Sequence, residues 1–278
     1  MVFDWLQSIA YAVISGFAEV LPISAQVHRL LLLKMFGMGA EPRMLRLFVH
    51  VGVLLALYYA CQSNIIRMIR ARKLARIPKK KRKRPLDTRS LMEFSLWRTM
   101  VVPVIVPFFL YDKASALGDN KILMATFLFL NGLILYIPQF LPTGNKDCRT
   151  LSRVEGILMG LGGGCAVIPG FSGVGASLSI ASVCGVDRTY GLGMVLLMDM
   201  GIVFCRIVWD FIYLFKMGLD PMGFLVFVSY IVSAGLAFAA AMLGIKLMRR
   251  LAAGKGYGIF AYYCWGLALF TFVLNLVV

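Results

Sequence analysis

The sequence is poor in charged residues and has no clustered cysteines, and both absences exclude classes of protein. Charged residues make up 15% of the 278 residues, against about 25% in an average soluble domain. The six cysteines, at positions 61, 148, 165, 184, 205 and 264, form no CxxC pair. The spacing therefore excludes a zinc or disulfide framework, and we interpret the cysteines as small apolar packing residues.

Acidic residues are also few, because 29 basic residues face only 13 acidic ones and the net charge is +16. Nucleic-acid binding is the first class that such a charge suggests. The basic residues are bunched, however: residues 67–84 hold eleven Lys or Arg and no acid. No aromatic residues are interleaved there to stack on bases. We therefore expect no nucleic-acid partner, and a cytoplasmic loop held against anionic lipid instead.

Long apolar stretches dominate the rest of the chain, which is 60% hydrophobic with a mean hydropathy of +0.82. Six stretches reach the length of about 20 residues that a membrane-spanning helix needs. The sequence thus predicts an all-α polytopic membrane protein forming a single domain. No basic segment precedes the first apolar stretch, so we expect the N-terminus to belong to the mature fold. The six expected spans are 44–62, 96–112, 122–142, 192–215, 222–247 and 257–278.

The basic residues also predict the orientation of these spans. If the loop 63–95 is cytoplasmic, the loops 143–153 and 246–256 are cytoplasmic too. Together the three loops hold 19 of the 29 basic residues, whereas the outer connections hold five. The charge bias is therefore consistent along the whole chain.

Two further apolar segments, 5–33 and 154–184, are interrupted midway by Pro22 and Pro169. Proline ends or kinks a helix, and non-helical backbone is tolerated at membrane depth only where it lines a protein cavity. We predict that both segments are re-entrant helical hairpins. Each is followed by a long apolar span, so we predict an inverted repeat, with one unit at about 1–142 and the other at about 143–278. Such repeats build anion sites near the membrane midplane.

Three polar residues, Glu19, Ser24 and His28, surround the first break. Ionisable groups in the membrane are functional candidates by default, and a hairpin could bring Glu19 and His28 to one pocket. The alternatives are a carboxylate that binds the other hairpin's backbone, a helix N-cap and a packed histidine. The second break is followed by a glycine-rich turn whose Ser172, Gly175 and Ser177 could cradle phosphate or simply pack helices.

These two segments carry a resemblance to a known family. The stretch GFAEVLPISAQVH, residues 16–28, resembles the first signature of the undecaprenyl-diphosphate phosphatase (bacitracin-resistance) family, commonly GxxExLP[VI]SS[TS]GH. The stretch PGFSGVGAS, residues 169–177, is similar to its second signature, PGxSRSGx[TS]. The likeness spans the whole chain and includes GVDRT at 185–189 and FAYY at 260–263.

The resemblance implies a protein of the bacterial inner membrane with inverted repeats and two re-entrant hairpins. Members remove the terminal phosphate of a polyprenyl diphosphate on the outer side and regenerate the carrier lipid for cell-wall synthesis. It implies that Glu19, Ser24 and His28 are catalytic, with Glu19 holding Mg²⁺ or Ca²⁺ or the proton, and that Ser24 or water is the nucleophile. Phosphate binding falls to Ser172, Gly175 and Ser177, and a homodimer remains an option.

The chain departs from both signatures. Ser15, Ala25 and Val27 replace signature residues in the first, and Gly173 and Val174 replace the arginine and serine of the second. Arginine stabilises charge in phosphoryl transfer, so another cation would have to replace it. Three candidates are Arg29, Arg188 and Arg206. Arg206 lies two helical turns from Asp199, which allows either a structural pair or a role in the site.

Three functions are therefore open. The first is a polyprenyl diphosphate phosphatase. The second is a relative that binds or translocates polyprenyl phosphate without hydrolysis, and the third is a transporter of another small anion.

Overall fold

The protein was analysed as a computed structural model, which describes residues 5–37, 41–217, 223–254 and 256–277. These residues form helices joined by short connections, and they contain no β-strand. Parts of the expected segments lie outside the described residues: 1–4, 38–40, 218–222, 255 and 278. The predicted all-α polytopic class is confirmed.

Both proline-interrupted segments are helical hairpins, as predicted. Helices α1 (Trp5–Glu19) and α2 (Ala25–Met35) are joined by the turn that contains Pro22. Helices α7 (Arg153–Gly164) and α8 (Gly173–Val183) are joined by the short helix η4 (Cys165–Val167) and the turn that contains Pro169. Gly170 in this turn has a φ of +103°, which strongly favours glycine.

Five helices among the described residues are long and apolar enough to cross a membrane: α3 (Arg43–Ala75), α4 (Thr88–Phe108), α6 (Lys121–Tyr136, continued by η3, Ile137–Phe140), α9 (Arg188–Met217) and α10 (Phe224–Ala253). The sixth expected span corresponds to α11 (Ile259–Val277), which is shorter in its apolar part and packs along α6. The short helices α5 (Tyr111–Ser115) and η2 (Ala116–Asp119) lie between α4 and α6.

The basic segment 63–95 was predicted as a loop, and this was wrong for most of its length. Helix α3 continues through it to Ala75, and α4 begins at Thr88, so only residues 76–87 with the short helix η1 (Lys79–Lys81) connect the two. Arg and Lys are good helix formers, so a span that ends in water can continue as a helix through them.

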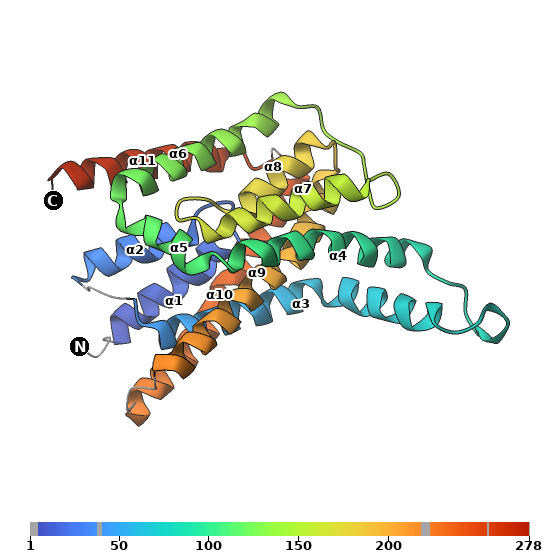
Figure 1. Ribbon diagram of the computed structural model, residues 1–278, viewed down its shortest axis with the longest axis horizontal. Helices are drawn as coiled ribbons and strands as arrows, with labels where there is room; N and C mark the ends of the chain where they lie inside the picture. The colour runs from blue at the N-terminus through green and yellow to red at the C-terminus, as the bar shows by residue number, and fades with distance from the viewer. Residues whose placement is uncertain (1–4, 38–40, 218–222, 255, 278) are drawn as a thin grey trace.

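The two halves place the same elements in the same order, with α1 to α4 and α6 corresponding to α7 to α11. Helix α1 packs against α10, and α7 packs against α4, which is the same contact with the halves exchanged. In Figure 1 the hairpin α1–α2 opens toward the end where α11 finishes, and α7–α8 opens toward the opposite end, where α3 and α4 are joined. The repeat boundary near residue 142 remains a prediction, and this exchange of contacts supports it.

Glycines in equivalent places fix each hairpin against its long helix. A Cβ atom at Gly16 of α1 would lie 2.6 Å from the carbonyl oxygen of Ala237 in α10. A Cβ atom at Gly160 of α7 would lie 2.2 Å from the carbonyl oxygen of Met100 in α4. Since no larger residue allows this approach, the glycines set how closely both hairpins enter the core.

Candidate active site

The turns of the two hairpins meet in the centre of the protein and bind one another. The hydroxyl of Ser24 accepts a hydrogen bond from the N–H of Gly170 at 3.1 Å. In the other direction, the hydroxyl of Ser172 donates to the carbonyl of Leu21 at 3.2 Å. Each serine lies at the N-cap position of the second helix of its hairpin. The two serines therefore link the turns of the two hairpins. The sequence predicted each turn but not the contact between them.

The start of α8 is exposed to this junction. The hydroxyl of Ser172 also accepts from the N–H of Gly175, which caps the helix. The N–H groups of Gly173 and Val174 have no acceptor among the described residues, as is usual for the first residues of a helix. Unpaired N–H groups and the helix dipole make such a position suited to an anion.

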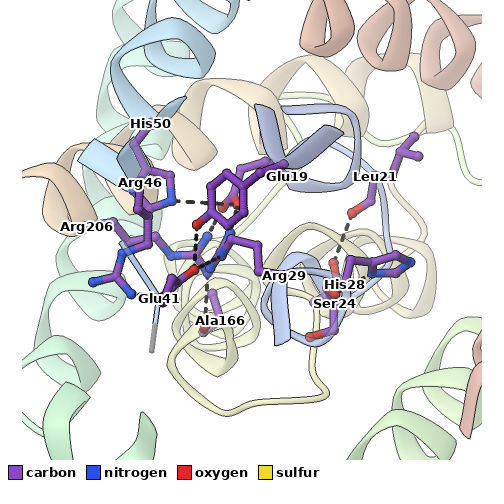
Figure 2. Close-up of polar contacts among 12 residues, drawn as sticks. Glu19, Leu21, Ser24, His28, Arg29, Glu41, Arg46, His50, Ala166 and Arg206 are labelled. Carbon is purple, nitrogen blue, oxygen red and sulfur yellow. Dashed lines mark hydrogen bonds and ion pairs between the residues drawn. The ribbon is translucent and has the colours of Figure 1, made fainter. Parts of the chain in front are cut away.

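Glu19, the last residue of α1, is the centre of a buried group of charges. Its carboxylate pairs with Arg29 of α2 at 3.0 Å and with Arg206 of α9 (Figure 2). Its side chain is 3% exposed. Arg206 also donates to the carbonyl of Ala166 at 3.1 Å, so it connects α9 to the second hairpin. Two of the three candidate cations thus bind the first candidate acid.

The group of charges continues toward Glu41, in the connection between α2 and α3. Glu41 accepts from Tyr11 at 2.6 Å and pairs with Arg29 at 3.0 Å and with Arg46. Arg46 of α3 in turn pairs with Asp210 of α9.

His50 completes the network, since its two ring nitrogens lie 3.4 Å from Asp210 and 4.0 Å from Glu19. Sequence analysis did not select Glu41, Arg46, His50 or Asp210. Three of them, however, lie in or next to predicted spans, and a charge at membrane depth is the signal that could have found them.

A small polar cavity lies where Glu19, Arg206 and the start of α8 meet. It has a volume of about 10 Å³, and the paired side chains of Glu19 and Arg206 are part of its lining. Asp199 of α9 contributes a further carboxyl group. The lining residues are Glu19, Ile23, Ala25, Gln26, Ala166, Phe171, Ser172, Gly173, Val174, Asp199, Ile202 and Arg206. The cavity therefore combines a helix start, one guanidinium and two carboxyl groups.

His28 does not share this cavity with Glu19, contrary to our expectation (Figure 2). Its Nδ1 donates to the carbonyl of Ser24 at 2.7 Å, and its Nε2 lies 2.6 Å from the hydroxyl of Tyr263. The two rings stack. His28 lines a second, apolar cavity of about 400 Å³. Ile23 lines both cavities, so the α1–α2 turn separates them.

The remaining candidates lie elsewhere. Ser177 donates to the carbonyl of Met159 at 2.6 Å and so packs α8 against α7, outside the polar cavity. Arg188 begins α9 and donates to the carbonyl of Gly254 at 3.4 Å, away from both hairpin turns. No ion pair joins Asp199 to Arg206 in the described part of the chain, because Arg206 pairs with Glu19. The structural pair considered from the sequence is therefore absent there.

The donor set does not fit the divalent cation that the resemblance implied. Both oxygens of Glu19 face guanidinium groups, which already balance the negative charge that a Mg²⁺ or Ca²⁺ ion would use. The described residues contain no group of three His, Cys, Asp or Glu side chains able to share an ion. We therefore derive no step through a metal.

The fold and the cavity define a class: a polytopic helical membrane protein in which two opposed re-entrant hairpins meet at a buried, charged site suited to an anion. The sequence matches the family described as "Bacitracin resistance protein BacA" over residues 8–270. The chain belongs to this family, as its signatures suggested.

The names of individual relatives agree with this family assignment. An undecaprenyl-diphosphatase of Methanobrevibacter smithii is 28% identical over 97% of both chains. An undecaprenyl-diphosphatase of Halothermothrix orenii is 23% identical over 94% of this chain and 95% of its own. One from a Nocardioides species is 30% identical over 66% of each chain.

Proposed function

We propose that this protein is an undecaprenyl-diphosphate phosphatase, which hydrolyses a polyprenyl diphosphate to the lipid monophosphate and phosphate. Membership of the BacA family and the names of its near full-length relatives support this activity. The substrate class also agrees with the fold, because the lipid chain stays in the bilayer while the diphosphate reaches a site buried between helices.

The observation that carries the proposal is the position of the α8 N-terminus beside Arg206. The free N–H groups of Gly173 and Val174 and the guanidinium of Arg206 line one cavity at the junction of the hairpins. Phosphoryl transfer depends mainly on positioning and on stabilising charge on the phosphate oxygens. Arg206 would supply from α9 the cation that the signature places at position 173.

Arg206 can leave Glu19 at little electrostatic cost. Breaking a buried ion pair is strongly unfavourable when one charge is left alone, but Glu19 would keep Arg29 at 3.0 Å. A cavity of about 10 Å³ has room for about one water. A terminal phosphate therefore enters only when the Glu19–Arg206 pair opens, and its charge takes the place of the carboxylate at Arg206.

Ser24 and water are both retained as nucleophiles in this proposal. The Ser24 oxygen accepts from Gly170, so its own hydrogen stays available to a base. His28 binds the Ser24 carbonyl on the other side of the turn, where it can hold a proton near the apolar cavity. Glu19 would orient the guanidinium groups and the attacking oxygen.

The protein would lie in the inner (plasma) membrane, with the α3–α4 connection in the cytoplasm. The basic residues of that connection support this orientation. The first hairpin would then open to the outer side, where the resemblance places the reaction.

Phosphate release from undecaprenyl diphosphate by the purified protein, in Mg²⁺ and in EDTA, tests the function. We expect turnover, and we expect Glu19→Gln and His28→Ala to lower kcat at least about 100-fold if both groups are positioned for catalysis. Unchanged yield and monodispersity in detergent serve as the control. A wild-type protein that binds polyprenyl phosphate but releases no phosphate would instead be the non-hydrolytic relative.

A further inference from the structure

Asp199 is a buried carboxyl group that neither signature of the family contains. It lies in the middle of α9, is 2% exposed and lines the polar cavity together with Glu19 and Arg206. Its Oδ2 atom has no hydrogen-bond partner, and the described residues provide no ion pair for it. A buried polar group without a partner is unfavourable for stability, so its presence requires another explanation.

We propose that Asp199 is the proton donor of the site, the group that protonates the lipid monophosphate as it leaves. The inference rests on the proposed phosphatase function. The proposal gives the role of proton donor to a residue of α9, whereas the family signatures place the catalytic residues on the two hairpins.

The other ionisable groups near the hairpin turns already have partners. Glu19 is paired with two guanidinium groups. His28 is bound by Ser24 and Tyr263 and faces the apolar cavity. Asp199 alone among these three faces the polar cavity without a countercharge, and an uncharged acid is the form that such a place tolerates.

The surroundings of Asp199 limit what else can titrate there. Within the described residues, the charged groups that share its cavity are Glu19 from α1 and Arg206 from α9 itself. The thiol of Cys61 on α3 also interacts with it electrostatically. Helices α4, α7 and α10, which pack against α9, contribute no side chain to the cavity, and α8 contributes only the uncharged Gly173 and Val174.

The position also suits the geometry of the reaction. Asp199 and Arg206 are seven residues apart on one helix, so they face the same side two turns apart. A terminal phosphate bound by Arg206 and the start of α8 would lie in the cavity that Asp199 also lines. A single helix would then supply both the cation and the acid.

The proton balance of the step is simple. The oxygen of water, or first that of Ser24, bonds to the terminal phosphorus, and the bond from that phosphorus to the bridging oxygen breaks. On the Ser24 route the hydroxyl proton passes to a base, and water then cleaves the bond between Ser24 and phosphorus and restores the hydroxyl. The bridging oxygen leaves on the lipid monophosphate and takes the proton of Asp199. A proton from the attacking water restores the acid, so the net reaction consumes one water and needs no other reactant.

Asp199→Asn is the matched test, because the amide keeps the shape and neutrality of the acid and lacks only the proton to transfer. We expect kcat for undecaprenyl diphosphate to fall about 100-fold with KM little changed. The wild-type kcat should fall on the alkaline side as Asp199 loses its proton, and this limb should be absent from the variant. Asp112→Asn, which alters a carboxylate bound to Trp209 outside the cavity, should leave kcat unchanged.

A second substrate separates chemistry from packing. Nitrophenyl phosphate has a leaving group that needs no proton, so Asp199→Asn should lose much less activity on it than on the lipid. Equal losses on both substrates, or an Asp199→Asn variant with wild-type kcat, overturn the proposal.

If the variant does not purify as a monodisperse protein, the wild-type pH profile decides. A kcat that does not change with pH while the protein stays folded overturns the proposal. A wild-type protein without phosphatase activity overturns the proposed function as well, which distinguishes the two failures.

Discussion

Ser24 and Ser172 hold the two membrane hairpins together by reciprocal hydrogen bonds to each other's turn, at 3.1 Å and 3.2 Å. They occupy matching positions in the two halves, directly before α2 and α8. A residue that the family resemblance makes a candidate nucleophile is therefore also a structural contact, and the two roles can be separated by experiment.

Ser24→Ala should lower the free energy of unfolding by about 1–3 kcal/mol, because it leaves the buried N–H of Gly170 without an acceptor. Ser177→Ala is the comparison: it removes a donor to the carbonyl of Met159, which keeps its helical bond, and a weak contact with the sulfur of Met198, so we expect a smaller loss. Thermal unfolding in detergent measures both. Equal stability of the two variants would contradict the role of Ser24 as the link between hairpins.

Arg206→Met should lower kcat for phosphate release at least about 1,000-fold, the lower end for an arginine that stabilises transferring phosphate. Arg188→Met is the matched control, since the Arg188 side chain donates to the backbone of Gly254 and does not line the cavity, and it should keep normal turnover. If Arg188→Met is inactive and Arg206→Met is not, the missing cation has been assigned to the wrong residue.

Gly173→Ala should destabilise the protein, and Gly173→Arg should not restore a faster enzyme. From the sequence alone, an arginine returned to this position could have raised activity. A Cβ atom there would lie 2.6 Å from the carbonyl oxygen of Gly163 and 2.8 Å from the Cβ of Ala166. The backbone of α7 would have to shift to accommodate it, which is energetically unfavourable. Lower yield and melting temperature of both variants are the expected result, and a stable, more active Gly173→Arg protein would show that the hairpins can separate.

Acid should weaken the start of α7. Lys146 and the N-cap Ser152 hold the pKa of Glu155 at about 2, below its ordinary value of 4.5. The carboxylate therefore stabilises the fold above pH 4.5, and this contribution disappears as the pH falls from 4.5 toward 2. Melting temperatures of the wild type and Glu155→Gln should converge over that interval. Parallel curves would mean that the capping box adds no stability.

Labelling can test the orientation of the chain. In a cysteine-free variant, one cysteine added within 79–84 should react only from the cytoplasm, and one added at position 118 only from outside. The first lies in the basic α3–α4 connection and the second in η2, at the other end of α4. Reaction of both from the same side would contradict the predicted topology.

The sequence predicted what depends on neighbouring residues. Pro22 and Pro169 mark the breaks correctly because the effect of proline on a helix is local. The long spans followed from hydropathy, although α3 runs 13 residues past its expected end at 62, since hydropathy does not detect a helix of Arg and Lys in water. The family signatures identified the hairpins that meet at the site.

The pairing of distant residues could not be predicted in this way. Glu19 and His28 are nine residues apart, yet α1 and α2 place them in different cavities. Besides Arg29, the partner of Glu19 proved to be Arg206, on a helix of the other half. The periodicity of a segment does not predict how its helix is rotated about its own axis relative to a distant helix. Close contacts between distant residues, such as that of Gly16 with Ala237, set this rotation.

The ion pair between Arg46 and Asp210 has a consequence for how the protein is made. The two residues are 164 positions apart, on α3 and α9. A ribosome releases α3 long before α9 exists, so during synthesis the membrane receives a helix with an arginine whose nearest permanent countercharge in α9 is still missing. Glu41, five residues before Arg46, is the carboxylate already available at that stage. The first half can therefore insert with Arg46 already paired to Glu41, and the arrival of α9 adds Asp210 as a second partner that joins the two halves.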